Sequence, residues 1–319
     1  MEKENIQMIS LVIPLLNEDE SIEKLHQKIN GVLKKNNYPF EIIYIDDGST
    51  DNSVKKIEHL RKNSEEKIKI IQFRRNFGKA AALSAGFKEA EGDLIITMDA
   101  DLQDEPEEIP KMINKINEGY DLVSGWKQDR KDPKIKLFSS KIFNFTISSL
   151  TGIKLHDFNC GFKIYRREVI KNIDVYGELH RFLPVLAHQK GFKVGEEKVK
   201  HNSREYGISK YGRSGLRRIK NYILDTINIF LITKYSKKPL HFFGNVGLIF
   251  FLIGFVIESY LTFLRLTTGS IQNHTPLLML GILLIIIGTQ LISLGLLGEI
   301  IIRFNQKRDD VYSIKKKLV

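Results

Sequence analysis

The sequence predicts an α/β protein with a mostly parallel sheet, helices on both faces, C-terminal amphipathic helices and a two-helix transmembrane hairpin. Three observations lead to this prediction. Strand-like and helix-like segments alternate through the first half of the 319 residues, acidic residues follow several strands, and the longest apolar stretches lie after Pro239. The first half is therefore expected to form an α/β domain and the last part a membrane anchor.

The order of strands and helices in the first half predicts its fold class. Buried strands are predicted over residues 9–14, 41–45, 68–73, 93–98 and 120–124, and helices over 20–34, 51–61, 78–90 and 106–118. Apolar strands that alternate with helices form parallel sheets covered on both faces. In such sheets the ligand crevice lies outside the carboxyl ends of the strands. Function is therefore expected at that edge.

Two amphipathic segments, residues 135–150 and 216–231, follow in the chain. Basic residues surround the start of the second, at Arg213, Arg217, Arg218 and Lys220. They can be ordinary surface helices that pack on a core, or helices that lie in the plane of a membrane surface. The second interpretation fits better, because basic residues meet an apolar stripe just before a hydrophobic span.

Residues 240–266 and 276–302 are each long and apolar enough to cross a bilayer. Lysines and arginines flank the pair, whereas the connecting residues 267–275 contain none. The excess of positive charge predicts that the N-terminal domain and the tail face the cytoplasm. Glu258 and Glu299 lie within or near the ends of the spans; intramembrane acids are candidate functional residues, although Glu299 can also reach the interface.

These segments define four predicted parts of a multi-pass protein of the cytoplasmic membrane. They are an α/β domain (1–212), a juxtamembrane amphipathic helix (213–238), two transmembrane helices (239–304) and a basic cytoplasmic tail (305–319). Association into a homo-oligomer would let two thin spans per chain bury more of their polar atoms.

The amino-acid composition limits the classes of molecule that the protein is expected to bind. Lys+Arg 49 against Asp+Glu 38 gives a formal net charge of +11, which suits nucleic acid, an anionic membrane surface or phosphorylated substrates. Nucleic acid is disfavoured, because the charge concentrates beside the spans and no platform of aromatic and basic residues is apparent. Cys160 is the only cysteine, so the chain has no internal disulfide, as expected in a reducing cytosol.

The sharpest chemical signal is the pair Asp99 and Asp101, followed by Gln103, at the end of a predicted strand. Two carboxylates one residue apart can reach one hard cation, and Mg²⁺ or Mn²⁺ often binds one or two carboxylates plus substrate phosphates. Gln103 can add a carbonyl oxygen. The pattern alone is common by chance, but here it lies in a sheet with a second acidic strand end.

That second acidic turn, residues 46–49, follows an earlier strand, and residues 74–79 bring basic side chains and a glycine before a helix. Carboxylates can accept hydrogen bonds from a base or a ribose hydroxyl, and a helix start suits phosphate. A solvated turn would explain residues 46–49 alone. It would not explain two acidic strand ends and the polar pair Asn17 and Glu18 after the first strand.

Together these motifs resemble the polyprenyl-phosphate branch of the family-2 glycosyltransferases with the Rossmann-like GT-A fold. The branch includes dolichyl-phosphate mannose synthases, GtrB-type bactoprenol glucosyltransferases and the aminoarabinose transferase ArnC. The resemblance rests on residues 13–18, 46–49, 75–79, 98–103 and 106–110, and continues through 161–166, 201–211 and 296–299. It covers nearly the whole chain.

The resemblance implies roles for individual residues. The base and ribose site matches Pro14, Leu16, Glu18, Ile45 and Asp47; the diphosphate and metal positions match Asp99, Ala100, Asp101 and Gln103, with Lys79 also on the donor side. Asp157 matches an acid that acts at the acceptor, and Arg204 and Lys210 match basic residues near the two phosphate groups.

The implied reaction is the inverting transfer of one sugar from a nucleotide-sugar to polyprenyl (undecaprenyl) phosphate, with Mg²⁺ or Mn²⁺ as cofactor. UDP-glucose and UDP-N-acetylglucosamine are favoured as donors by likeness to bacterial members, and GDP-mannose stays open. A processive polysaccharide synthase is the enzymatic alternative. It is disfavoured because the sole tryptophan, Trp126, lies in no Q-x-x-R-W stretch. The third alternative, a non-catalytic nucleotide-binding membrane protein, has little need of a metal site beside a basic clamp.

Overall fold

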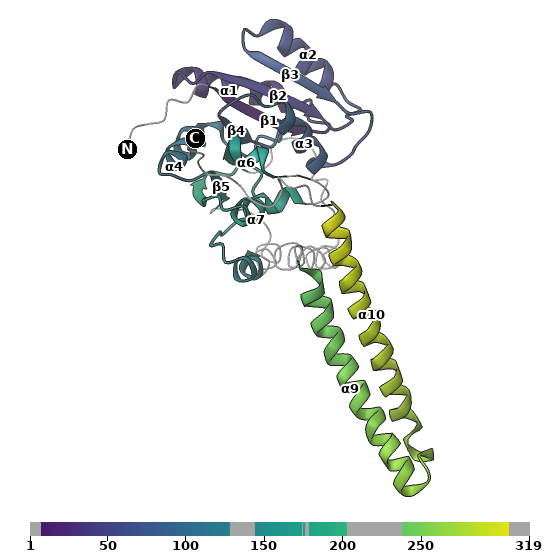
Figure 1. Ribbon diagram of the computed structural model, residues 1–319. Helices are drawn as coiled ribbons and strands as arrows, with labels where there is room; N and C mark the ends of the chain where they lie inside the picture. The colour runs from purple at the N-terminus through teal and green to yellow at the C-terminus, as the bar shows by residue number, and fades with distance from the viewer. Residues whose placement is uncertain (1–7, 128–143, 174, 176–178, 203–237, 306–319) are drawn as a thin grey trace. The chain divides into compact units, whose positions relative to one another are not determined.

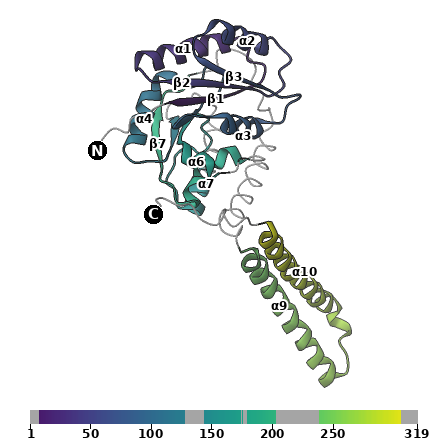
Figure 2. The same ribbon diagram turned by 45° about the horizontal axis from the view of Figure 1, so that its top comes forward.

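The structure is a computed structural model that describes residues 8–127, 144–173, 175, 179–202 and 238–305. The chain divides into two compact units, one holding the described residues up to 202 and the other those from 238. The first unit is an α/β domain and the second a pair of long helices (Figures 1 and 2).

The α/β domain contains one seven-stranded sheet in the order β3-β2-β1-β4-β6-β5-β7. Its strands are β1 (Ile9–Leu15), β2 (Phe40–Asp46), β3 (Lys67–Gln72), β4 (Leu94–Thr97), β5 (Leu122–Lys127), β6 (Lys163–Arg166) and β7 (Val194–Val199). β6 runs antiparallel to both β4 and β5, and the other neighbours pair in parallel. The carboxyl ends of β1, β2, β4, β5 and β7 therefore share one edge. The prediction of a mostly parallel sheet is confirmed.

Helices cover both faces of this sheet. They are α1 (Ile22–Lys35), α2 (Ser53–Asn63), α3 (Lys79–Glu89), η1 (Pro106–Glu108), α4 (Ile109–Asn117), α6 (Arg167–Lys171), η2 (Leu179–Phe182) and α7 (Leu183–Gln189). One buried cluster joins α1, α2 and α4 to the sheet, and a second joins α3, α6 and α7 to it. The two clusters use alternate residues of the same strands, as a sheet buried on both faces requires.

Sequence reasoning misses two strands and misplaces one helix start. β6 has only four residues, and β7 carries two glutamates and a lysine, so neither shows the apolar run of a buried strand. The helix expected over 106–118 begins as a 3₁₀ turn and becomes α-helical at Ile109. Pro110 explains the change, because a residue without an N–H fits only the first turn of an α-helix.

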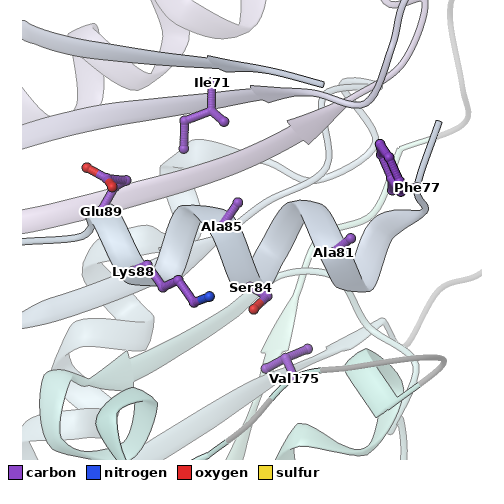
Figure 3. Close-up of a pocket in the computed structure, with 8 residues that line it drawn as sticks. All are labelled: Ile71, Phe77, Ala81, Ser84, Ala85, Lys88, Glu89 and Val175. Atoms are coloured by element: carbon purple, nitrogen blue, oxygen red, sulfur yellow. The ribbon is translucent and has the colours of Figure 1, made fainter. Parts of the chain in front are cut away.

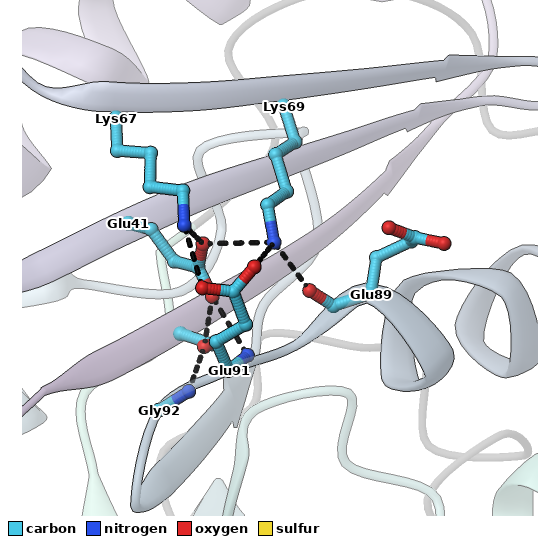
Figure 4. A network of polar contacts seen from close by, with 7 residues as sticks. Glu41, Lys67, Lys69, Glu89, Glu91 and Gly92 are labelled. Atoms are coloured by element: carbon cyan, nitrogen blue, oxygen red, sulfur yellow. Dashed lines mark hydrogen bonds and ion pairs between the residues drawn. The ribbon is translucent and has the colours of Figure 1, made fainter.

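The amino edge of the sheet carries a buried carboxylate that hydrogen-bond donors and lysines surround (Figure 4). Glu41, whose side chain is 0% exposed, accepts hydrogen bonds from Ser10 Oγ at 2.7 Å and from the backbone N–H of Glu91 at 2.8 Å. Lys69 and Lys67 lie 3.2 and 3.5 Å from its Oε2, and Lys67 also pairs with the Glu91 carboxylate at 2.6 Å. This network ties β1, β2 and β3 together where the chain enters β4.

The second unit consists of α9 (Pro239–Thr268) and α10 (Thr275–Asn305), joined by a short connection that contains η4 (Gln272–His274). Both helices are long and apolar enough to cross a membrane, and their large apolar side chains are mostly exposed. The expectation of two long apolar helices after Pro239 is confirmed. Of the two amphipathic segments, residues 216–231 lie outside the described part, as do residues 135–143 of the first.

Glycines let the two long helices approach closely. A Cβ on Gly247 would lie 2.6 Å from the Gly288 carbonyl oxygen, and one on Gly254 would lie 2.7 Å from that of Gly281. Such contacts between small residues are a common way for helices to associate in lipid. Glu258 packs against Gly281 in the same seam, and its Oε1 is buried without a hydrogen-bond partner among the described residues.

Candidate active site at the carboxyl ends of the strands

The loops that follow β1 and β2 are bound to each other at the carboxyl edge. The Asn17 N–H donates to Ser49 Oγ at 2.8 Å, and the Thr50 N–H donates to Asn17 Oδ1 at 2.8 Å. Asn17 has a positive φ of 51°, a conformation that asparagine tolerates better than most residues. All five residues predicted for the base and ribose site lie on these two strand ends: Pro14, Leu16, Glu18, Ile45 and Asp47.

Two of those five have a further role that the sequence does not reveal. The buried Asp47 carboxylate accepts hydrogen bonds from the backbone N–H groups of Phe77 at 2.7 Å and Gly78 at 3.0 Å. It therefore holds the loop before α3 against β2. Ile45 is fully buried under α3, so its side chain belongs to the core.

The predicted diphosphate position lies at the start of α3 and the end of β4. Lys79, the first residue of α3, pairs with Oδ1 of Asp99. Gly161, just before β6, lies so close to Asp99 that a Cβ there would be 2.5 Å from Oδ2. Any other residue at 161 would displace that carboxylate, so the glycine is part of the site.

Asp101 is the least compensated acid of this edge. Burial, together with the negative charges of Asp99 and Asp104, raises the pKa of Asp101 to about 6. The Gln103 N–H, which donates to Asp101 Oδ1 at 3.2 Å, offsets only part of this effect. Like charges that are forced together without compensation favour the binding of a cation.

The residues present fit a divalent metal whose ligands come partly from the protein and partly from a bound substrate. Within the described ranges, no group of three or more His, Cys, Asp or Glu side chains could hold a metal by itself. Asp99 and Asp101 offer two hard oxygen donors, and Mg²⁺ and Mn²⁺ readily complete such a pair with phosphate oxygens and water. Gln103 is anchored nearby, since its Nε2 donates to the Asn202 carbonyl at 3.2 Å.

Asp104, in contrast, is a paired structural acid. Its buried carboxylate lies 2.8 Å from Lys127 Nζ and 3.5 Å from His201 Nδ1. Burial opposes ionisation of Asp104, but the positive charge of Lys127 and the contact with His201 hold its pKa well below the usual range. Sequence reasoning did not identify this group, because no spacing links three residues on separate segments.

Asp157 lies beside β5 and is also buried. Its Oδ1 accepts the Asn159 N–H at 3.1 Å, and its carbonyl accepts Ser124 Oγ at 3.4 Å. Near it, Lys163 is buried in β6 and donates to the Cys160 carbonyl. Burial lowers the pKa of Lys163 to about 8, against the opposing charges of groups that include Asp157 and Asp99. The charge of the buried Lys163 ammonium thus interacts with both Asp99, a predicted metal ligand, and Asp157, the predicted acid at the acceptor.

His180 in η2 completes the set of site residues that the sequence did not indicate. Burial and the positive charges of Lys79, Arg181 and Lys163 lower the pKa of His180 to about 2, so its imidazole is neutral. Its Nδ1 is buried without a hydrogen-bond partner in the described part of the chain. The predicted Arg204 and Lys210 lie outside the described residues.

A groove of about 560 Å³ runs along α3 (Figure 3). Figure 3 shows α3 side chains between Ile71 on one side and Val175 on the other. The full lining is Ile71, Phe77, Ala81, Ser84, Ala85, Lys88, Glu89 and Val175. None of these is a predicted site residue, and the acids described above do not line the groove. It therefore adjoins the candidate site only at Phe77, whose N–H donates to Asp47.

Several known proteins are similar to this chain in sequence. The model of the family "Glycosyl transferase family 2" matches residues 10–174. The chain is 38% identical to the dodecaprenyl-phosphate galacturonate synthase of Rhizobium johnstonii, over 95% of this chain and 89% of that protein. It is 36% identical to the undecaprenyl-phosphate 4-deoxy-4-formamido-L-arabinose transferase of Proteus mirabilis, over 93% and 89%.

Among solved structures, the fold is similar to that of glucosyl-3-phosphoglycerate synthase from Mycobacterium tuberculosis in complex with Mn²⁺, uridine diphosphate and phosphoglyceric acid. The TM-score is 0.52 at 18% identity, over 71% of this chain and 78% of that one. The likeness concerns the α/β fold.

Proposed function

The chain belongs to glycosyl transferase family 2, and from this premise we propose that it transfers one sugar from a nucleotide-sugar to a polyprenyl phosphate. The observation that carries the proposal is that Asp99 lies against Gly161, only four residues after the buried Asp157, with the buried Lys163 close by in sequence. This supports a metal-and-diphosphate position near an acceptor position. The names of the two relatives, which both describe transfer to a polyprenyl phosphate, support the same acceptor class.

In the proposed reaction a phosphate oxygen of the acceptor attacks the anomeric carbon, and the bond from that carbon to the nucleoside diphosphate breaks. The anomeric centre inverts in this single displacement. A phosphate monoester has a second pKa near 6, so the acceptor is already largely anionic at neutral pH. Asp157 therefore positions the acceptor and shapes the local field more than it removes a proton. Lys79 and Lys163 offset the negative charge that gathers between donor and acceptor.

Mg²⁺ or Mn²⁺, held by Asp99 and Asp101 with Gln103 nearby, would supply the positive charge that stabilises the departing diphosphate. The nucleotide would lie over the ends of β1 and β2, beside Glu18 and Asp47. Arg204 and Lys210 remain the proposed clamp that holds the two phosphate groups together. The product is a lipid-linked sugar for modification of a cell-envelope glycan.

We also propose that the α/β domain and the tail face the cytoplasm, with residues 267–275 outside. The lysines and arginines that flank α9 and α10, and their absence between the helices, support this orientation. Cysteine labelling on a Cys160→Ser background tests it, since Cys160 is the only native cysteine. A cysteine in the loop that reacts only from the inside would overturn the orientation.

The proposed function is tested with the purified full chain, a polyprenyl phosphate and a panel of donors. The panel holds UDP-glucose and UDP-N-acetylglucosamine, which sequence resemblance favours, and the galacturonate and 4-formamido-arabinose donors that the relatives' names indicate. Mass spectrometry should show a lipid phosphate that has gained one sugar. A ladder of added sugars would instead support a processive synthase, and the absence of any product across the panel would contradict the proposal.

A further inference from the structure

The carboxyl edge of the sheet divides into two halves. β2, β1 and β4 carry the proposed nucleotide and metal positions, whereas β5 and β7 lie beyond the antiparallel β6. Ser124 pairs with Glu196 and Trp126 with Lys198 across these two strands. The donor occupies the first half in the proposed function, so the acceptor phosphate must approach Asp157 from the side of β5 and β7.

A glutamate–histidine pair lies on this side, directly before Asp157. Both oxygens of Glu196 contact His156: Oε2 accepts its backbone N–H at 2.8 Å, and Oε1 lies 2.5 Å from its Nδ1. The Asn144 side chain donates to the His156 carbonyl at 2.6 Å. The backbone and the ring of His156 are therefore held together, and the next residue in the chain is Asp157.

The imidazole of His156 also stacks on the only tryptophan of the chain. The ring centroids of His156 and Trp126 are 4.0 Å apart, and their planes differ by 10°. Lys198 Nζ lies 5.1 Å from the Trp126 ring centroid. Stacking on Trp126 and the two contacts with Glu196 hold the His156 ring in one orientation. The ring of an ordinary surface histidine, by contrast, can rotate freely.

This arrangement determines which nitrogen of His156 is available. An ionised carboxylate only accepts hydrogen bonds, so Nδ1 carries the hydrogen that faces Glu196. Nε2 is left on the opposite side of the ring, and it has no hydrogen-bond partner within the described ranges. The side chain of His156 is 61% exposed and that of Glu196 is 18% exposed. The partly buried Glu196 thus holds the His156 ring so that Nε2 faces solvent.

We propose that His156, held by Glu196 and stacked on Trp126, binds the phosphate of the acceptor lipid through Nε2. The proposal rests on the proposed function and assigns a residue on the acceptor side. When Nε2 also carries a hydrogen, the ring donates to Glu196 from Nδ1 and to a phosphate oxygen from Nε2. Trp126 and Lys198 suit the same ligand, because an amphipathic ring and a cationic head on an apolar stem match a phosphate joined to an isoprenoid chain.

Steady-state kinetics test this assignment by separating the two substrates. In His156→Ala the KM for a short polyprenyl phosphate should rise by about tenfold or more, with the KM for the nucleotide-sugar unchanged. Glu196→Gln should raise the acceptor KM less, because the ring loses its charged support but keeps a hydrogen-bonding partner. His188→Ala, which removes an exposed histidine of α7, is the matched control and should behave as wild type.

The single tryptophan gives a readout that does not need turnover. Titration of the full chain with farnesyl phosphate in detergent should change Trp126 emission saturably. Farnesol, which lacks the phosphate, and uridine diphosphate should not produce this change, and the response should be weakened about tenfold in His156→Ala. UDP binding measured by calorimetry verifies that each variant is folded.

The outcomes separate this inference from the function on which it rests. An acceptor KM within about twofold of wild type in both His156→Ala and Glu196→Gln would overturn the inference and leave the proposed function standing. A rise confined to the donor KM, or equal responses to farnesol and farnesyl phosphate, would also overturn it. A wild-type chain that glycosylates no polyprenyl phosphate would overturn both.

Discussion

Two acids at opposite edges of the sheet, Glu41 and Asp101, differ in how far the surrounding groups compensate their charge. At the amino edge, Glu41 has a hydrogen bond or a lysine for each of its oxygens, and the whole network closes on itself (Figure 4). At the carboxyl edge, Asp101 is partly buried beside Asp99 and Asp104, and the pKa of Asp101 rises to about 6. A buried carboxylate thus stabilises the amino edge, where its charge is compensated. At the carboxyl edge the charge of Asp101 is not compensated, which favours the binding of a cation.

The pKa values of these two acids shift in opposite directions, in line with this difference. Burial pushes the pKa of Glu41 upward, but hydrogen bonds from Ser10 and the Glu91 backbone, with the nearby Lys69, outweigh it and lower the pKa. Lys67 and Lys69 lower the pKa of Glu91 to about 2. An acid whose pKa falls on folding stabilises the fold, whereas one whose pKa rises destabilises it until a ligand compensates. The comparison therefore separates residues of the fold from residues of the site.

The largest expected effect is at the carboxyl edge. Asp101→Asn should lower kcat/KM by about a thousandfold, because the metal position loses one of its two carboxylates. The variant should nevertheless unfold at the same temperature as wild type or higher in EDTA, since a source of repulsion is removed. Turnover assays and thermal melts on one preparation check both. Full turnover of wild type in EDTA would refute the metal assignment.

The proposed phosphate clamp should give the next largest effect. Arg204→Ala and Lys210→Ala are each expected to lower kcat/KM by roughly 10- to 150-fold, the loss of one charge-assisted contact of about 1.5–3 kcal/mol. Arg217→Ala, assigned to membrane contact, is the milder control. If both clamp variants kept near wild-type transfer while Arg217→Ala abolished it, the clamp would be misplaced.

At the amino edge the effect should fall on stability alone. Glu41→Gln should cost about 2 kcal/mol, because Lys67 and Lys69 lose the charge of the buried carboxylate that they contact. For a domain of this size that corresponds to a melting temperature lower by roughly 5 °C. The kcat/KM per folded molecule should stay unchanged. A selective loss of turnover in Glu41→Gln, without a lower melting temperature, would break the distinction between the two edges.

The smallest effect is the pH dependence of that stability. The folded pKa values of Glu41 and Glu91 lie below their unfolded values, so their stabilisation is present above the unfolded pKa. It is lost as pH falls through the folded values, which for Glu91 is about 2. Melting temperatures of wild type and Glu41→Gln should therefore converge between pH 6 and pH 3. A constant difference over that range would contradict the pairing.

The sequence predicts the carboxyl edge better than the amino edge. Asp99, Asp101 and Asp47 follow apolar strands, and topology then brings strand ends together. The fold class and the two long apolar helices are likewise confirmed. Glu41 lies inside a predicted strand, where a charged residue looks like a solvated position, and its partners Ser10 and Lys69 come from other strands, so only the register of the sheet reveals them. Lys163 lies in β6, which the sequence does not predict.

The pair formed by His156 and Glu196 of β7 shows the same limit. His156 and Glu196 are 40 positions apart in sequence and meet only because β7 joins the sheet beside β5. β7 is too polar to be predicted as a strand, so the pair could not be predicted either. The individual roles assigned to site residues from resemblance, including those of Arg204 and Lys210, stay predictions.

Metal binding tests the central claim most directly, because the contrast between the edges concerns an uncompensated charge. Mn²⁺ binding to the full chain in the presence of uridine diphosphate can be followed by electron paramagnetic resonance. Wild type and Glu41→Gln should bind Mn²⁺ with the same affinity, and Asp101→Asn should bind it at least about a hundredfold more weakly. Unchanged Mn²⁺ affinity in Asp101→Asn would contradict the claim that this edge is built to receive a cation.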